Sequence, residues 1–287
     1  MPMDPALLAL LLSPPALALF GLCIGSFLNV VVYRLPIMLE AQWCRECAEL
    51  LETPVPAKGQ TTLSLWRPRS RCTSCGHVLR WYENIPLLSW LALRGRCSAC
   101  QAPISWRYPL VELSTGALFG LLAWQLGPQP TTLLWCGFVA ALLTLALIDW
   151  DTTLLPDSIT QPLLWAGLVA AAMGWNLRLN DALWGAVAGY LSLWTVTWFF
   201  KLVTGKIGMG NGDFKLLAAL AVWLGPSMII PIVLGASMLG AVVGIGMKLT
   251  GQLREGRFVP FGPFLAGAGL VVLFAGQDTV SGWLGWY

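Results

Sequence analysis

Residues 132–149 read TLLWCGFVAALLTLALID, an apolar run that is closed by Asp149. A run of this length approaches the roughly 20 apolar residues that carry a helix across a bilayer. A carboxylate at the edge of the hydrocarbon costs a few kcal/mol unless it is protonated, paired or hydrated. The stretch therefore predicts a membrane-spanning helix, and it marks Asp149 as a candidate functional residue.

Apolar runs of similar character recur along the whole chain. The protein has 287 residues, of which 57% are hydrophobic and 11% charged, and its mean hydropathy is +0.70. Such values are typical of polytopic membrane proteins. We therefore predict an all-α polytopic membrane protein with about eight transmembrane helices, near residues 6–32, 109–126, 132–149, 158–175, 182–203, 214–224, 227–248 and 261–276. The pattern leaves open whether the shortest run, 214–224, crosses the bilayer completely.

Positive charge gathers on one side of this predicted topology. With the N-terminus outside, sixteen of the seventeen Lys and Arg residues fall on the inner side, and only Arg178 does not. This asymmetry is the positive-inside pattern, so we expect the inner side to be cytosolic. The first apolar run follows no cation and precedes no small-residue cleavage site, which favours a retained anchor over a signal peptide. The net charge of +3 reflects the loop bias and gives no indication of a nucleic-acid partner.

The sequence divides into three predicted regions. Residues 1–33 form a first transmembrane anchor, 34–108 a small cytosolic domain, and 109–287 the remaining membrane domain. The middle region contains ten of the cations and six of the eight cysteines. A domain of this size buries only a modest core and commonly adds a metal or disulfides.

Four of these cysteines have the spacing of a zinc ribbon. Cys72 and Cys75 form one C-x2-C pair, Cys97 and Cys100 form another, and 21 residues separate the pairs. Two such pairs complete the tetrahedral shell of one zinc ion, whose role would be structural because no position stays open for substrate. Two disulfides or four unrelated thiols are the alternatives, and a reducing cytosol disfavours the disulfides.

A third pair, Cys44 and Cys47, has no place in a saturated four-cysteine site. We expect free thiols there, while a peptidase with an open metal held by this pair is a further hypothesis. His77 is the only histidine, which excludes any site that needs two. Its position beside Cys75 favours a role in the loop over metal ligation.

Acidic residues in two loops are the candidates for catalysis. Asp149 belongs to an apolar run, whereas Asp151 and Asp157 follow in the polar loop and suit solvation and helix capping. Asp213 follows a glycine-rich turn and precedes the apolar run 214–224. Taken alone, Asp213 also fits a helix cap. In that turn Gly210 and Gly212 carry no side chain, so a substrate chain could approach closely.

The two membrane-edge acids, Asp149 and Asp213, suit aspartyl proteolysis if they meet. Like-charge repulsion between two close carboxylates leaves one of them protonated near neutrality. The ionised partner can then activate a water molecule and the protonated partner can stabilise the oxyanion. A proton or ion pathway in a transporter, or a membrane scaffold with a zinc domain, is the alternative of another class.

Several further motifs accompany these features along the chain. In order they are Gly25 to Val30 with Arg34 to Pro36, the two cysteine pairs, Glu83 to Pro86, Arg107 to Glu112, Asp149 to Asp157 and Gly210 to Lys215. In this order the motifs resemble those of the bacterial type IV prepilin leader peptidase and N-methyltransferase family over nearly the whole chain. The glycine-aspartate element, Gly210 to Asp213, is also similar to that of presenilin-like proteases, but the zinc domain and residues 107–112 favour the prepilin branch.

This resemblance implies Asp149 and Asp213 as the catalytic residues and the same four cysteines as zinc ligands. It further implies type IV prepilins and pseudopilins as substrates, cleavage after a glycine at the cytosolic face of the inner membrane, and methylation of the new N-terminal residue. S-adenosylmethionine is implied by the resemblance alone, because no strand precedes a G-x-G-x-x-G motif. Arg94 to Arg96 are a candidate donor region, or a site for anionic lipid heads. The prepilin species and the oligomeric state are not indicated.

Overall fold

The computed structural model describes residues 4–60, 63–206, 208–251 and 259–285. Within these ranges the chain is almost entirely helical, as the sequence predicts, and the β structure consists of two isolated bridges. The helices are α1 (Pro5–Leu11), α2 (Pro14–Leu50), η1 (Ala57–Gln60), η2 (Trp81–Asn84), α3 (Leu88–Ala92), α4 (Arg107–Leu126), α5 (Pro130–Thr152), α6 (Asp157–Ala172), α7 (Leu179–Thr204), α8 (Asn211–Leu224), η3 (Pro226–Met228), α9 (Ile229–Leu249), α10 (Gly262–Ala275) and α11 (Gln277–Trp283).

Every one of the eight predicted apolar runs contains a helix. Fewer than eight of these helices, however, are long enough to cross a membrane completely. Five helices of the described part are long and apolar enough to cross a membrane: α2, α4, α5, α7, and α9 together with η3. Helices α10 and α11, bent by 107°, make a sixth if they form one span. Helices α6 and α8 have only 16 and 14 residues. The protein is therefore a multi-pass membrane protein, and the count of eight spans stays a prediction.

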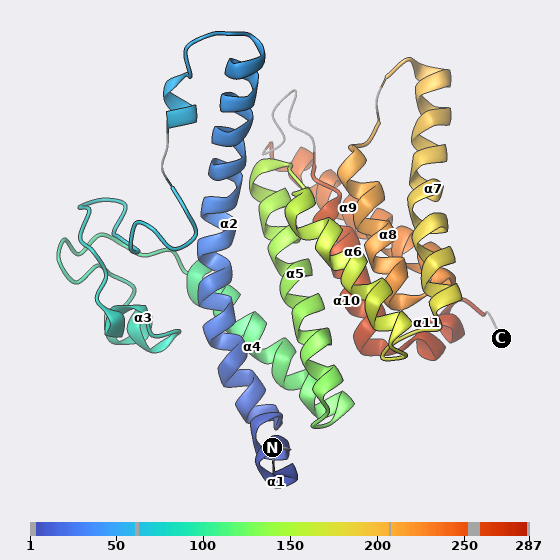
Figure 1. Cartoon of the computed structure of the whole chain (residues 1–287), viewed down its shortest axis with the longest axis horizontal. Coiled ribbons are helices and arrows are strands. Elements are labelled where there is room, and N and C mark those ends of the chain that lie inside the picture. The colour runs from blue at the N-terminus through green and yellow to red at the C-terminus, as the bar shows by residue number, and fades with distance from the viewer. Residues whose placement is uncertain (1–3, 61–62, 207, 252–258, 286–287) are drawn as a thin grey trace. The chain divides into compact units, whose positions relative to one another are not determined.

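The chain separates into two compact units, residues 1–140 and 141–287. In the first unit, α2 packs along α4 (Figure 1). Glycines permit this approach, because a Cβ on Gly25 would lie 2.7 Å from the Glu112 Cα. Helix α2 also continues unbroken through Pro36 to Leu50. The predicted end of the first anchor, at residue 33, thus lies inside a helix, and the three-region division remains a prediction.

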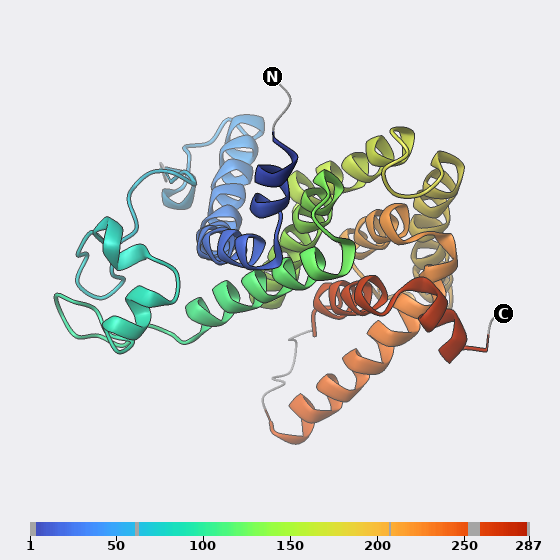
Figure 2. The ribbon, with the colours of Figure 1, turned by 90° about the horizontal axis from the view of Figure 1, so that it is seen from below.

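The second unit is built around α8 (Figures 1 and 2). Helices α6, α7 and α10 pack against it, and each residue from Leu216 to Leu224 is at most 3% exposed. A helix that is apolar on all sides is expected in such a central position. Gly185 and Gly189 let α7 approach α8 closely, because a Cβ on either residue would lie within 3 Å of an α8 backbone oxygen. The core of the second unit therefore holds the element that begins with Asp213.

Candidate active site and metal centre

Asp149 lies in the last turn of α5 and is 5% exposed. Its Oδ2 atom accepts a hydrogen bond of 2.9 Å from the backbone N–H of Gly262, the first residue of α10. The N-terminus of a helix offers unpaired N–H groups and a partial positive charge, so it is a favourable neighbour for a carboxylate. The apolar run therefore ends in a buried acid that the start of another helix holds.

Asp213 lies in the first turn of α8 and is 8% exposed. Leu155 lies against Gly212, the residue before Asp213, and against Gly262, whose N–H donates to Asp149, so the two acids lie in one region of the second unit. The structure thus brings together the two acids that the sequence selects. Asp151, by contrast, is exposed, and Asp157 carries a side chain that is 59% exposed.

The loop between α5 and α6 closes around this pair. Leu155 fills the space beside both neighbouring glycines: a Cβ on Gly212 would lie 2.8 Å from the Leu155 Cβ, and a Cβ on Gly262 3.2 Å from its Cδ2. Asp157 ends the loop, and both of its carboxylate oxygens accept a hydrogen bond from Lys215 Nζ of α8, at 2.7 and 2.8 Å. The loop is therefore held against the starts of α8 and α10.

The two glycines of the predicted substrate-approach loop have different surroundings. Gly210 is exposed, and the nearest atom to a Cβ built there is Asp213 Oδ2, at 3.8 Å. Gly212 faces Leu155 of the same chain. Only Gly210 therefore offers an open backbone beside the acids.

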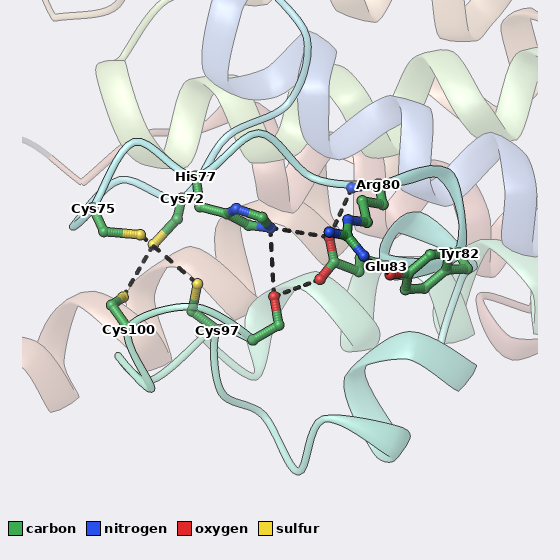
Figure 3. A network of polar contacts seen from close by, with 9 residues as sticks. Cys72, Cys75, His77, Arg80, Tyr82, Glu83, Cys97 and Cys100 are labelled. Atoms are coloured by element: carbon green, nitrogen blue, oxygen red, sulfur yellow. Dashed lines mark hydrogen bonds and ion pairs between the residues drawn. The ribbon is translucent and has the colours of Figure 1, made fainter.

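The four predicted zinc cysteines form one cluster. Their sulfur atoms all lie within 4.8 Å of one another, with 3.8 Å between Cys72 and Cys100 and 4.0 Å between Cys75 and Cys97 (Figure 3). Four sulfurs at about 2.3 Å from a tetrahedral zinc ion are about 3.8 Å apart. The cluster has the size of a four-thiolate metal site, and all eight cysteines carry free thiols.

The electrostatics of the cluster favour a bound cation. Backbone N–H groups of Cys75 and Ser74 lower the pKa of Cys72 to about 6. The N–H of His77 lowers the pKa of Cys75, but the surrounding thiols, with Cys100 first, raise it to about 12. Four thiolates at this spacing therefore repel one another, and a dication removes that repulsion.

The two knuckles share one backbone pattern. In the first, Cys72 N–H donates to the carbonyl of His77, and Gly76 N–H donates to the carbonyl of Cys72. In the second, Cys97 and Gln101 use their N–H groups in the same way. Both turns need a left-handed residue, which is Gly76 at φ 73° in one and Gln101 at φ 60° in the other. Only the first turn uses the residue that adopts this conformation without strain.

Glu83 links the two knuckles (Figure 3). Its Oε2 lies 3.3 Å from His77 Nε2 and accepts the Arg80 N–H at 2.7 Å, while its Oε1 accepts the Ser98 hydroxyl. The Arg80 N–H, then Ser98 and His77, lower the pKa of Glu83 to about 2. His77 thus bonds to a carboxylate and not to the metal cluster, as expected for a loop residue.

Cys44 and Cys47 lie on helix α2, away from the four-thiol cluster. Cys44 packs against η1, where a Cβ on Gly59 would approach its side chain to 3.3 Å, and Cys47 is exposed. Among the described residues, the four cysteines of the knuckles form the sole cluster of three or more potential metal ligands. In the described part of the chain, Cys44 and Cys47 therefore have no third ligand beside them, which an open metal site held by this pair would need.

Sequence reasoning missed Gly262 and Leu155 as parts of the aspartate site. Gly262 lies between Phe261 and Pro263 at the start of an apolar run, a pattern that indicates a helix start. Nothing in that pattern shows that its N–H meets a carboxylate 113 residues earlier. Leu155 carries no polar group and gives no signal at all.

Two family models match the chain. The Bacterial Peptidase A24 N-terminal domain covers residues 19–126, and the Type IV leader peptidase family covers residues 136–245. Curated relatives named prepilin leader peptidase/N-methyltransferase match both regions together. One from Stutzerimonas stutzeri is 50% identical over 92% of this chain and 91% of its own length, and one from Pseudomonas putida is 51% identical over 91% and 90%.

A third relative of the same name, from Aeromonas hydrophila, is 49% identical over 92% of this chain and 91% of its own length. No solved structure matches the chain. The match thus extends across both the thiol cluster and the aspartate pair, and it agrees with the resemblance noted from the motifs. The chain belongs to the prepilin leader peptidase/N-methyltransferase family.

Proposed function

We propose that this protein is an aspartyl endopeptidase that removes the leader peptide of type IV prepilins and pseudopilins, and that it methylates the new N-terminus. The observation that carries the peptidase half is the burial of Asp149 and Asp213 in one region, where Leu155 lies against both Gly212 and Gly262 and the Gly262 N–H donates to Asp149 Oδ2. The names of the relatives support both halves. No finding supports a scaffold or an ion-relay transporter.

Cleavage follows the chemistry of two carboxyl groups that share one proton. The ionised member takes a proton from water, and the resulting hydroxide attacks the carbonyl carbon of the last leader residue, a glycine. The protonated member donates to the developing oxyanion, and the leaving amine is then protonated. Gly262 N–H fixes the Asp149 carboxylate, which supports a set geometry for this transfer. The open backbone at Gly210 supports entry of an extended substrate there.

The four-cysteine cluster serves as a structural zinc site in this proposal. Residues Cys72, Cys75, Cys97 and Cys100 fill a tetrahedral shell and leave no position for water, so peptide hydrolysis does not pass through the metal. The ion joins two knuckles whose chain has no other extensive core. The charge bias of the sequence supports placing this domain and the aspartates at the cytosolic face of the bacterial inner membrane.

The decisive experiment uses the purified full-length protein in detergent with one prepilin and S-adenosylmethionine. Mass spectrometry of the prepilin N-terminus reads cleavage and methylation together. We expect Asp149→Asn and Asp213→Asn each to lower the cleavage rate by at least about 10²- to 10⁴-fold, because each removes a proton-transfer group. Asp151→Asn is the matched control, since its side chain is exposed two residues from Asp149.

The same variants separate the two activities. A synthetic peptide that already begins with phenylalanine needs no cleavage, so its methylation should persist in Asp149→Asn and Asp213→Asn. Parental cleavage in either variant would refute the assignment of that aspartate. Absence of cleavage by the purified wild-type protein would instead refute the peptidase proposal and favour a role that needs other proteins.

A further inference from the structure

The first unit contains a cavity of about 250 Å³ between α2 and the segment 65–84. None of its lining residues belongs to the aspartate site or to the four-thiol cluster. Sites for whole small molecules measure roughly 300–1,000 Å³, so this space suits one group of a larger ligand that extends beyond it. The functions assigned so far leave the cavity without a role.

The cavity lies where α2 passes from apolar to polar sequence. Phe27 and Val30 line it from the apolar run 6–32, and Arg34 lines it just beyond that run. The wall from Phe27 to Arg34 rises about 10 Å along the helix, whereas each headgroup layer of a bilayer is about 5–8 Å thick. Because α2 is long and apolar enough to cross a membrane, this wall covers the depth at which lipid headgroups meet the hydrocarbon.

Arg34 builds the polar end of the cavity. This side chain is 8% exposed, and its guanidinium donates to the backbone carbonyls of Ser64 at 2.9 Å, Leu65 at 3.3 Å and Pro68 at 2.8 Å. A buried cation is stable only when its donors are satisfied in this way. Arg34 thus fixes the loop 64–68 against α2. The carbonyls are neutral, so the wall keeps a full positive charge.

The charges around the cavity are of one sign. Arg34, Arg69 and Arg80 line it, and no Asp or Glu side chain does. Arg69 is exposed and has no hydrogen-bond or ion-pair partner in the described part of the chain. Arg80 is partly occupied, because its Nη1 donates to the Tyr82 hydroxyl at 2.7 Å. The guanidinium fork of arginine matches the oxygens of a phosphate and binds them through charge-assisted hydrogen bonds. This lining therefore fits an anionic group with several oxygens, such as a phosphate.

Two large indoles stand at the mouth of the cavity. Trp66 and Trp81 both line it, yet each is 78% exposed. Trp66 also stacks on Phe27 of the apolar run, with ring centroids 5.5 Å apart and planes inclined by 23°. Exposed apolar side chains that gather in this way mark a surface that lipid or protein covers. Trp is enriched where membranes meet water, and the contact with Phe27 joins these indoles to a membrane helix, which favours lipid.

We propose that this cavity binds the headgroup phosphate of an anionic phospholipid from the surrounding bilayer. Arg69 and Arg80 donate to the phosphate oxygens, while the acyl chains run along the apolar part of α2 that carries Phe27. The indoles lie at the interface beside the headgroup. The bound lipid thus links α2 to the segment that leads into both cysteine knuckles. This inference does not depend on the peptidase or the methyltransferase activity.

Two alternatives fit the same region less well. The implied methyl donor carries a sulfonium and an ammonium against one carboxylate, so a lining with three arginines and no acid does not fit it. Arg94 and Arg96, the candidates from the sequence for a donor or for lipid heads, do not line the cavity. Between them, Gly95 packs against the Trp90 ring, to which a Cβ would approach within 2.9 Å.

The test titrates the purified full-length protein in detergent with phosphatidylglycerol and counts bound lipids by native mass spectrometry. Arg69→Gln should weaken binding about 10- to 150-fold, the loss of one hydrogen bond to a charged group. Arg71→Gln is the matched control, because it removes the same charge two residues away, is exposed and does not line the cavity. General attraction to an anionic lipid predicts at most about a 5-fold loss there. Equal losses in both variants, or no loss in Arg69→Gln, overturn the site.

Two further ligands identify the source of the phosphate. Phosphatidylethanolamine with the same acyl chains carries an ammonium that the arginines repel, so it should bind at least about 10-fold more weakly. Glycerol 3-phosphate has the phosphate without acyl chains and should bind at least about 100-fold more weakly, the contribution of only about four buried CH₂ groups. Binding of glycerol 3-phosphate as tight as that of the lipid, lost in Arg69→Gln, would show a site for a soluble phosphate and overturn the lipid assignment.

A footprinting experiment distinguishes lipid from a protein partner. Hydroxyl radicals oxidise exposed indoles, and peptide mass spectrometry reads each Trp separately. By exposure in the protein alone, Trp66 at 78% should react faster than Trp43, which is 45% exposed on the polar extension of α2. In phosphatidylglycerol nanodiscs that contain only this protein, we expect the reverse order, because lipid covers Trp66. If Trp66 still reacts faster there, its face is open to water and available to a protein, which contradicts the proposal.

Discussion

Gly262→Ala tests the contact between α10 and Asp149. A Cβ on this residue would lie 2.6 Å from Asp149 Oδ2, whereas ordinary contacts of this kind begin at about 3.4 Å. The carboxylate must therefore retreat by about 0.8 Å. Its hydrogen bond to the Gly262 N–H, now 2.9 Å long, then exceeds the range of a good bond.

The expected loss follows from that bond. A hydrogen bond to a charged group contributes about 1.5–3 kcal/mol, which corresponds to about 10- to 150-fold in rate if the transition state depends on it. Displacing a catalytic group by nearly 1 Å has a comparable effect, about 10²-fold. We therefore expect kcat/KM for prepilin cleavage to fall by about 10- to 100-fold.

The assay compares cleavage with methylation of the phenylalanine peptide, which we expect to proceed without the aspartates. Gly267→Ala is the matched control, because it lies on the same helix and a Cβ there meets no atom within 4 Å. Cleavage by Gly262→Ala within twofold of the wild-type rate would refute the positioning role. A fall in methylation equal to the fall in cleavage would show general misfolding, and it too would count against the role.

The remaining predictions concern the thiol cluster and its surroundings. Cys97→Ser should lose the bound metal and lower the thermal unfolding temperature, measured by metal analysis and calorimetry, whereas Cys44→Ser should keep the metal stoichiometry of the wild type. Gln101→Gly should stabilise the protein by about 1 kcal/mol, because it removes left-handed strain at φ 60°, and an unchanged or lower unfolding temperature would contradict this. The pKa of Glu83 is depressed to about 2 from 4.5, so its contribution to stability is complete above about pH 4.5 and is lost as the pH falls towards 2. The difference in unfolding temperature between the wild type and Glu83→Gln should therefore shrink over that window, and a difference independent of pH would disprove the role of the ionised group.

Local patterns sufficed to predict the helices and the thiol cluster. An apolar run such as 132–149 predicts a helix, because a chain segment surrounded by lipid must satisfy its backbone hydrogen bonds internally. The C-x2-C pairs also predict their own cluster, because each pair closes a turn and one tetrahedral ion needs two pairs. The twin backbone pattern of the knuckles at Cys72 and Cys97 is the structural expression of that repeat.

The sequence was less informative where polar helices and distant contacts matter. Residues 34–50 are too polar to register as a membrane run, and Pro36 suggests a break, yet α2 continues through them. Hydropathy identifies helices that face lipid and overlooks the part of a helix that leaves it. Likewise, the position of Asp149 and Asp213 beside apolar runs identifies them as candidate functional residues, but the sequence does not show which residues contact them in space. Gly262 and Leu155 reach the site through packing among elements that are far apart in the chain.

These distant contacts extend the proposed active site beyond the residues that the Type IV leader peptidase model matches. The Type IV leader peptidase match ends at residue 245, whereas the N–H that holds Asp149 comes from Gly262 of α10, a helix that packs against α8. Val272 and Leu265 of α10 are at most 4% exposed, which places α10 in the core of the second unit. Helix α10 supplies both a buried face and the N–H donor to the Asp149 carboxylate, so it belongs to the catalytic unit that we propose. The position of the Asp149 carboxylate therefore depends on α10 as well as on α5, the helix that carries it.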